Sequence, residues 1–411
     1  SIGGVGIETV VAQHGTPVFI YDRSVLDRKL SALRNALPSK FAISYSVKAN
    51  PNRTILRHFV DRGCGLEIAS AGEFHLSRSI GCPPSNIVFA GPGKTEAELE
   101  RVLSDHIGQV HVESLTEIDR VAAISRRLGV KAKVAVRINP CAEAQGGAMR
   151  MGGRAAPFGI DEENLDSVLD RILAEPSVEF EGIHLFTGTQ ILDYAILARQ
   201  YRKAIEIAGR AAKKTRRPIH TVDFGGGLGI PYFPGEKELD TAALQKELMA
   251  LMIEIENDSS FRGTRFMVEP GRYLVGDGGV YVTRISDIKV SRGKKFLIVD
   301  GGMNHHLAAS GNLGQVIKRN FPVALLTKFR ERSAETVDIV GPLCTPLDVL
   351  AREAQVPTAA IGDLVGIFQS GAYARTASPL GFLSHPSPPE VWIDAGRVEL
   401  IRPRGRYSDC L

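Results

Sequence analysis

The feature of this sequence that most constrains its fold is a regular alternation of strand-like and helix-like segments between residues 41 and 275. Runs rich in β-branched and aromatic residues predict strands, and amphipathic runs between them predict helices, for example 95–103, 115–128, 195–214 and 242–255. The predicted strands are 42–47, 65–68, 87–90, 109–112, 133–138, 182–186, 221–224 and 265–268. Eight strands alternating with helices over about 235 residues match a (β/α)₈ barrel.

The pattern changes after residue 276, where short β-branched runs are separated by glycine and proline turns. These runs are 281–288, 295–299, 335–340, 364–368, 391–393 and 398–401. They predict a β domain, and the strand-like run 18–21 is expected to join it because it precedes the first helix. We therefore expect a barrel of residues 27–275 and a β domain of residues 1–26 and 276–411.

Composition excludes several classes of protein. The 411 residues are too many for one ordinary core, which favours two domains. A net charge of +4, spread over scattered basic pairs, does not favour a nucleic-acid partner. No apolar run has the length of a membrane span, and no signal peptide is recognisable. Five cysteines without metal-type spacing are typical of reduced thiols, so we expect a cytoplasmic protein without a metal site.

Lys48 comes at the end of the first predicted barrel strand and is followed by Ala-Asn-Pro, which terminates a strand. Burial at the lip of a strand would lower the pKa of its amine and make it a usable nucleophile. The alternative is a surface lysine that closes a strand, since most lysines are exposed.

Other unusual side chains also follow predicted barrel strands, at the end of the barrel where chemistry takes place. They are Glu67, Glu73, Arg137, His184, Phe186, Thr189, Gln190, Glu269 and Arg272. The run Gly225-Gly226-Gly227-Leu228-Gly229 follows the seventh strand, where backbone N–H groups of glycines can surround a phosphate. A tight strand-to-helix turn is the alternative interpretation. Arg272 could bind the same phosphate.

Glu269 could be an ordinary helix cap or the partner of a protonated pyridine nitrogen. Pyridoxal phosphate (PLP) requires a lysine, a phosphate cup and a charged group at its ring nitrogen. An acidic partner keeps that nitrogen protonated, which stabilises a carbanion after CO₂ leaves. Glu269 therefore favours decarboxylation over racemisation.

Seven segments in this order resemble those of the fold-type III PLP decarboxylases, which include the diaminopimelate, ornithine and arginine enzymes. The segments are 45–50, 67–73, 188–190, 225–229, 269–272, 341–344 and 371–373. The resemblance implies an alanine-racemase-like TIM barrel with a C-terminal β-sandwich or β-barrel domain. It also implies a homodimer with active sites at the interface.

By this resemblance Lys48 forms the Schiff base with PLP, and Glu269 pairs with the pyridine nitrogen. The other implied cofactor-binding residues are Glu67, Arg137, Phe186, Thr189, Gly226, Gly227, Gly271, Arg272 and Tyr373. Cys344 would enter from the partner subunit as an acid. From chemistry alone, this cysteine is more often a small buried apolar residue.

The departures from the family pattern concern the substrate. Phe186 stands where a histidine commonly stacks on the cofactor, so its role is packing. Thr345 follows Cys344 where diaminopimelate decarboxylases carry a glutamate that recognises a distal ammonium. The segment 300–312 replaces one that reads a distal carboxylate. A site that lacks the groups for both the distal ammonium and the distal carboxylate argues against diaminopimelate as the substrate.

A closer resemblance is to the branch that includes the glutamyl-carrier-protein decarboxylase of butirosin biosynthesis and the exosortase-associated PLP decarboxylases. The shared segments are 149–153, 186–190, 230–233, 300–306 and 344–346. This branch implies secondary metabolism and an aminoacyl thioester on a carrier protein, with which a pI of about 8.7 is compatible.

Four residues are predicted to contact the substrate: His305, His306, Thr345 and Asp348. The two histidines would lie near the site mouth, and a strand end with one satisfied histidine is the alternative. A free diamino-acid decarboxylase remains open. An amino-acid racemase would prefer an arginine at the ring nitrogen. A non-catalytic PLP-binding protein would typically be the barrel alone.

Overall fold

The computed structural model describes residues 1–141, 149–150, 155–313, 315 and 318–410. These divide into two compact units. The barrel unit comprises Ser31–Ile230 and Lys237–Tyr273, and the β unit comprises Ser1–Leu30, Pro231–Glu236 and Leu274–Leu411. Of the segment 149–153 that carries part of the family resemblance, residues 151–153 lie outside the described residues. No helix in the described ranges is long and apolar enough to cross a membrane.

The barrel unit is built on parallel strands, each hydrogen-bonded to the next around a closed ring. The order is β2 (Phe41–Ser46), β3 (Gly65–Ile68), β4 (Ile87–Phe89), β5 (Gln109–Val112), β6 (Ala132–Asn139), β9 (Val178–Leu185), β11 (Thr221–Asp223) and β12 (Arg265–Val268). Pairing of β5 with β6 and of β12 with β2 completes the ring. The predicted (β/α)₈ barrel is confirmed, because local periodicity reports strands that are buried on both faces.

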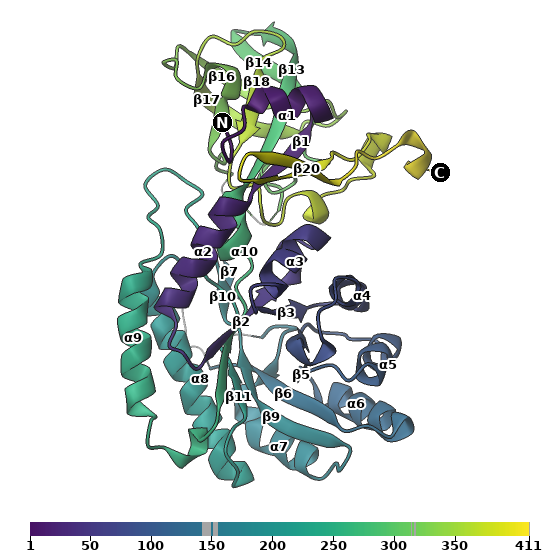
Figure 1. The fold of residues 1–411 in the computed structure, drawn as a ribbon, viewed down its shortest axis with the longest axis vertical. Helices are drawn as coiled ribbons and strands as arrows, with labels where there is room; N and C mark the ends of the chain where they lie inside the picture. The colour runs from purple at the N-terminus through teal and green to yellow at the C-terminus, as the bar shows by residue number, and fades with distance from the viewer. Residues whose placement is uncertain (142–148, 151–154, 314, 316–317, 411) are drawn as a thin grey trace. The chain divides into compact units, whose positions relative to one another are not determined.

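Helices lie outside the barrel strands (Figure 1). They are α3 (Arg53–Val60), α4 (Ala71–Ser79), α5 (Glu96–Ser104), α6 (Leu115–Leu128), α7 (Leu165–Leu173), α8 (Tyr194–Thr215) and α9 (Thr241–Glu254). Side-chain caps start several of them just after a strand: Ser70 accepts the N–H of Glu73, and Thr95 forms a capping box with Glu98. Each cap satisfies a backbone N–H group in the first turn of its helix, which fixes where the helix begins.

Short elements complete the barrel unit and its ends. The strands are β7 (Met149–Arg150), β8 (Ile160–Asp161) and β10 (Gly188–Thr189), and the helices at the unit boundaries are α2 (Arg23–Ala36) and α10 (Arg272–Val275). Strand β10 pairs with β7, and β8 extends the barrel sheet beyond β6.

The interior of the barrel is unusually polar for this fold, whose inward positions are normally filled by branched apolar residues. The buried polar side chains on its strands and strand ends include Ser44, Ser46, Glu67, Gln109, His111, Arg137, His184, Asp223 and Glu269. Burial of so many polar groups is costly unless they serve each other or a ligand, which identifies the barrel interior as the candidate site.

The β unit contains one mixed sheet in the order β17-β16-β14-β13-β1-β19-β20, with β18 pairing both β13 and β15. The strands are β1 (Val18–Asp22), β13 (Gly279–Ser291), β14 (Lys294–Val299), β15 (Val323–Leu325), β16 (Glu335–Val340), β17 (Val349–Val356), β18 (Leu364–Ile367), β19 (Glu390–Asp394) and β20 (Arg397–Arg402). Strand β1 lies between β13 and β19, so the prediction that the N-terminal strand joins this sheet is confirmed. The helix α1 (Ile7–His14) packs on the same apolar core.

Candidate active site

Lys48 lies in a single helical turn directly after β2 and faces a buried carboxylate. Its Nζ is 3.0 and 3.1 Å from the two carboxylate oxygens of Glu67, which also accepts the hydroxyl of Ser46 at 2.5 Å. The Lys48 side chain is 43% exposed, whereas that of Glu67 is 1% exposed. The expected desolvation of Lys48 is therefore wrong. Glu67 is the desolvated partner, and its carboxylate orients the accessible amine of Lys48.

Glu73 lies in the first turn of α4, beside this pair, and accepts the N–H of Ala69 at 2.6 Å. Burial, reinforced by the charge of Glu67, raises the pKa of Glu73 to about 7. The mouth of the barrel therefore holds a carboxyl group that changes charge near neutral pH.

Arg137 forms a buried ion pair with Glu113, at 2.8 Å. Glu113 also accepts the backbone N–H groups of Gly91 and Gly159 at 2.7 and 3.0 Å. Burial alone would raise the pKa of Glu113, but the Arg137 guanidinium holds it below its ordinary value. Glu113 thus links Arg137 to the backbone at Gly91 and Gly159. The Arg137 guanidinium carbon also lies 5.8 Å from the centroid of the Phe186 ring.

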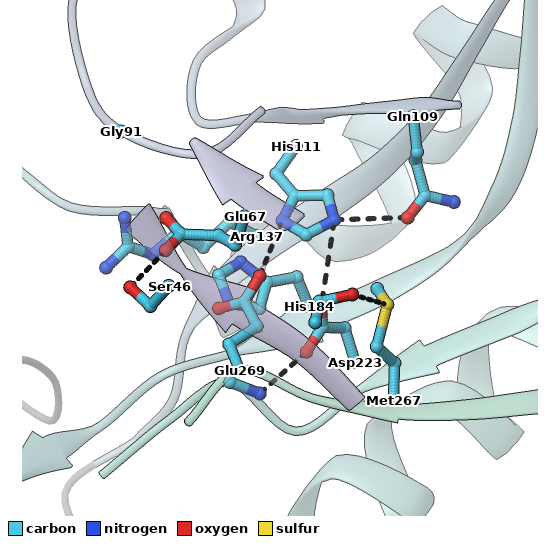
Figure 2. Close-up of polar contacts among 12 residues, drawn as sticks. Ser46, Glu67, Gly91, Gln109, His111, Arg137, His184, Asp223, Met267 and Glu269 are labelled. Carbon is cyan, nitrogen blue, oxygen red and sulfur yellow. Dashed lines mark hydrogen bonds and ion pairs between the residues drawn. The ribbon is translucent and has the colours of Figure 1, made fainter. Parts of the chain in front are cut away.

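Glu269 follows β12 and is faced by a histidine at each carboxylate oxygen. Its Oε2 lies 3.3 Å from His184 Nε2, and its Oε1 lies 3.9 Å from His111 Nδ1. The imidazole of His111 faces both Glu269 and Asp223, as the dashed lines in Figure 2 show. These four side chains are all buried.

Burial governs the ionisation of this cluster. It lowers the pKa of His184 to about 3 and that of His111 well below 6.5, so both imidazoles are neutral. Burial, together with the negative charge of Glu269, raises the pKa of Asp223 far above its ordinary value. Two adjacent buried carboxyl groups do not ionise together, and the cluster therefore presents a single anion.

The glycine run after β11 forms a backbone nest. Gly225 and Gly227 have φ of +66° and +100°, and the Gly225 N–H donates to Asp223 Oδ1 at 2.8 Å. The N–H groups of Gly226 and Gly227 have no hydrogen-bond acceptor among the described residues. A Cβ at Gly226 would lie 2.6 Å from the carbonyl oxygen of Glu269. The loop therefore requires glycine and leaves two N–H groups for an anion.

Gly271 serves backbone packing next to Lys48. A Cβ at this position would lie 2.9 Å from the Cβ of Ala49 and 3.2 Å from that of Ser46. Its lack of a side chain lets the end of β12, with Glu269 and the following Arg272, approach the turn that carries Lys48.

The segment after β9 closes this side of the barrel. Gln190, with a positive φ of 59°, binds both the carbonyl and the N–H of Ile230 through its side-chain amide. Phe186 lies against the glycine run, since a Cβ at Gly225 would approach its ring within 3.1 Å. Thr189 belongs to β10. A phenyl ring beside the anion nest suits the packing role predicted for Phe186.

In the β unit, Cys344 is exposed, so the alternative interpretation of it as a small buried residue is wrong. Thr345 follows it and accepts the N–H of Leu347 through its hydroxyl, at 3.3 Å. Tyr373 adopts a positive φ of 51°.

The placement of His305 and His306 at a site mouth is not what the structure shows. His305 is 2% exposed and its Nδ1 lies 3.0 Å from the Tyr281 hydroxyl. His306 is fully buried, and its Nε2 lies 2.9 Å from the Ser370 hydroxyl. Both histidines therefore belong to the core of the β unit.

Asp348 is also a structural residue within this unit. It is 3% exposed and accepts the backbone N–H groups of Met303 and Leu343 at 2.6 and 2.9 Å. Each of its oxygens is thus used to join two loops, which leaves a supporting role in place of the predicted substrate contact.

Sequence reasoning missed His111, Glu113 and Asp223, which the structure brings together with the predicted residues. Each lies in or directly after a predicted strand that is otherwise apolar. A titratable residue at an inward position of a buried strand was the available signal.

Comparisons with known proteins agree with this arrangement. The family model described as "Pyridoxal-dependent decarboxylase, pyridoxal binding domain" matches residues 23–276. The chain belongs to the pyridoxal-dependent decarboxylases. It is 36% identical over 406 residues to the L-glutamyl-[BtrI acyl-carrier protein] decarboxylase of Niallia circulans, covering 98% of this chain and 94% of that protein.

Two further relatives are diaminopimelate decarboxylases. The enzyme of Aquifex aeolicus is 32% identical over 414 residues, with 99% of this chain and 93% of that protein covered. The structure of the Helicobacter pylori enzyme complexed with L-lysine aligns with a TM-score of 0.88 and 27% identity, covering 98% of each chain. The decarboxylase family, the barrel and the use of PLP, all predicted from sequence, are thereby confirmed.

The barrel residues fit the cofactor of this family. Lys48 offers an accessible amine, Gly226 and Gly227 offer backbone N–H groups to a phosphate, and Glu269 has a buried oxygen without a hydrogen bond among the described residues. The donors and the acceptor are each of the kind that PLP requires.

Proposed function

We propose that this protein removes the α-carboxylate of a glutamyl-like group carried as a thioester on an acyl carrier protein. The proposal is supported by the relative that acts on an L-glutamyl carrier protein, which aligns with 98% of this chain. A second support is the uncharged, partly exposed Thr345 after Cys344. A substrate without a free distal ammonium needs no carboxylate there.

The bound cofactor would supply the electron sink that stabilises the carbanion left by CO₂. Lys48 would hold it covalently, with Glu67 orienting the amine. Glu269 would hold the proton of its ring nitrogen. Gly226, Gly227, Arg272 and Tyr373 would bind its phosphate, and Phe186 would pack on its ring.

Arg137, Thr189 and Gly271 would support this constellation. Arg137 is paired with Glu113, and Gly271 allows the close approach of two strand ends. Their contribution is to hold the side chains around the cofactor in register.

We further propose a cytoplasmic homodimer in which Cys344 of one subunit donates a proton in the site of the other. Cys344 is exposed, as this role requires, and the four cysteines with described side chains are free thiols. Mixing Lys48→Ala with Cys344→Ala protein should restore about a quarter of wild-type activity, because half of the dimers are then mixed and each carries one intact site. No recovery in a mixture shown to exchange subunits would refute shared sites.

The substrate is tested by measuring CO₂ release from the PLP-loaded enzyme. The substrates are diaminopimelate, ornithine, lysine, arginine, glutamate and a glutamyl-pantetheine thioester. We expect release from the thioester alone. Release from diaminopimelate would return the protein to free amino-acid metabolism and overturn the interpretation of Thr345.

A further inference from the structure

Three buried polar atoms behind the cofactor site face each other without forming hydrogen bonds. Within the described part of the chain, His111 Nδ1, Asp223 Oδ2 and Glu269 Oε1 have no hydrogen-bond partner. Native proteins rarely leave such groups unpaired in a core. Their arrangement around one imidazole ring therefore calls for an explanation (Figure 2).

The His111 ring faces two carboxyl groups, which also lie close enough to interact directly with each other. Asp223 Oδ2 lies 3.7 Å from its Nε2, and Glu269 Oε1 lies 3.9 Å from its Nδ1. A movement of about 1 Å brings each pair to hydrogen-bond length. Catalytic hydrogen bonds are commonly long in unliganded structures and tighten around a ligand.

We propose that Asp223 and His111 position Glu269: a neutral Asp223 carboxyl donates its O–H to His111 Nε2, and the His111 Nδ1–H donates to Glu269 Oε1. The proposal rests on the role proposed above for Glu269 at the ring nitrogen. Asp223 and His111 do not touch the reacting atoms and act through Glu269.

The charges around His111 favour this distribution of protons. The ring is faced by Asp223 from β11, by His184 from β9 and by Glu269 after β12, while Lys94 and Arg137 add positive charge nearby. Burial, His184 and these two cations keep His111 neutral, so it carries one N–H only. Asp223, whose carboxyl is fully buried, keeps its proton beside the Glu269 anion.

The group that faces His111 Nε2 decides which nitrogen carries the hydrogen. The amide oxygen of Gln109, Oε1, lies 3.1 Å from this nitrogen, and a half-turn of the amide would bring its NH₂ group to the same place. Gln109 also borders a cavity of about 450 Å³ on the N-terminal side of the barrel strands. The proposal requires the Asp223 O–H at Nε2 and the Gln109 amide turned so that its NH₂ group faces the ring; the hydrogen of His111 then lies on Nδ1 and points to Glu269.

A donor at Oε1 stabilises Glu269 as an anion and fixes its carboxylate plane. His184 Nε2, 3.3 Å from Oε2, restrains the other oxygen. The ring nitrogen of the cofactor then faces a carboxylate that is held in its charged form. The ring nitrogen therefore keeps its proton to a higher pH.

The experiment follows the ring nitrogen directly in holoenzyme loaded with ¹⁵N-labelled PLP. The nitrogen chemical shift is recorded between about pH 6 and 9 for wild type, His111→Phe, Asp223→Asn and Ser44→Ala. His111→Phe keeps an aromatic ring but removes the donor, so its nitrogen should lose the proton about one pH unit lower than in wild type. Asp223→Asn replaces one neutral donor with another and keeps the acceptor for the Gly225 N–H. In this variant the ring nitrogen should therefore lose its proton at the same pH as in wild type.

Ser44→Ala is the control for disturbance of the barrel interior. Ser44 is buried in the same barrel and contacts Met267 at 3.1 Å, outside the Asp223–His111–Glu269 cluster. A wild-type titration in His111→Phe overturns the proposal. A large shift in Asp223→Asn also overturns it, because Asp223 would then act as an anion.

Glu269→Gln separates this proposal from the one on which it rests. If Glu269→Gln leaves the nitrogen titration unchanged, the role of Glu269 itself is wrong. If it changes the titration and His111→Phe does not, only the positioning pair is wrong. The four side chains His111, His184, Asp223 and Glu269 also lie close enough to ligate a metal ion. One equivalent of zinc in the purified holoenzyme would therefore also overturn the proposal.

Discussion

Each unit of the protein buries a pair of histidines, and the two pairs differ in what faces their nitrogens. In the barrel unit His111 and His184 face carboxylates, and three of their four nitrogens form no hydrogen bond among the described residues. In the β unit every nitrogen of His305 and His306 has a hydrogen-bond partner. Burial lowers the pKa of both pairs, so burial alone does not distinguish them.

The difference between the two pairs shows how the buried polar groups of a binding site can be distinguished from those of a structural core. The β unit uses its histidines as neutral, fully bonded core residues, which stabilise the fold. The barrel unit leaves polar atoms unpaired around an anion, which costs stability unless a ligand completes the set. In this protein the unpaired nitrogens of His111 and His184 distinguish the site histidines from the fully bonded His305 and His306.

The strongest test of the barrel as the cofactor unit is Lys48→Ala. Removing the amine should abolish covalent attachment of PLP, which is measured as loss of the visible absorbance band of the bound cofactor. Activity should fall by about a thousandfold or more. Lys40→Ala, which removes an exposed lysine from the same unit, should behave as wild type. Retained activity in Lys48→Ala would show that another group performs the chemistry.

Cys344→Ala tests what the β unit contributes. Loss of a proton donor should slow turnover by about a hundredfold, while the affinity for PLP stays unchanged because Cys344 is not among the residues proposed to hold the cofactor. Turnover and a PLP titration are measured on the same preparation. An unchanged rate would remove Cys344 from the proton-transfer step.

The two histidine pairs are compared directly by His184→Phe and His306→Phe. His306→Phe breaks the contact with Ser370 and leaves the Ala309 N–H unsatisfied, so it should destabilise the fold by about 2–3 kcal/mol without altering the spectrum of bound PLP. His184→Phe loses no hydrogen bond to the described protein, so it should weaken PLP binding and change stability by less than about 1 kcal/mol. Urea unfolding and PLP titration of both variants provide the measurement, and equal losses of stability would erase the distinction.

The smallest expected effect is the pH dependence of folding stability that His306 causes. Its pKa is lowered to about 3 by burial, so the unfolded chain binds a proton below pH 6.5 that the folded chain does not. Stability is therefore lost as pH falls, by about 2 kcal/mol for this group between pH 7.5 and pH 5. His306→Gln should narrow the difference in unfolding free energy between these two pH values by that amount. An unchanged difference would mean that the histidine is already protonated in the fold.

Most strands of both units were predictable, because β-branched runs and their spacing are local properties of the chain. Strand β17 was missed, since Arg352 and Glu353 interrupt its apolar pattern at the edge of the sheet. Lys48, Glu67, Glu269 and the glycine run were found because strand ends of a barrel converge. His305, His306 and Asp348 were misplaced, because a motif does not show which side of a strand or loop it presents.

The sequence by itself determined the barrel, the decarboxylase family and the cofactor, since these follow from periodicity and from residues fixed at strand ends. Only the tertiary structure decided which polar groups meet. It paired Lys48 with Glu67 and Arg137 with Glu113, and it placed His111 next to both Asp223 and Glu269. The two ion pairs join consecutive strands of the barrel. His111, Asp223 and Glu269 come from β5, β11 and the end of β12, far apart in the chain, and closure of the barrel brings them within a few ångströms of each other.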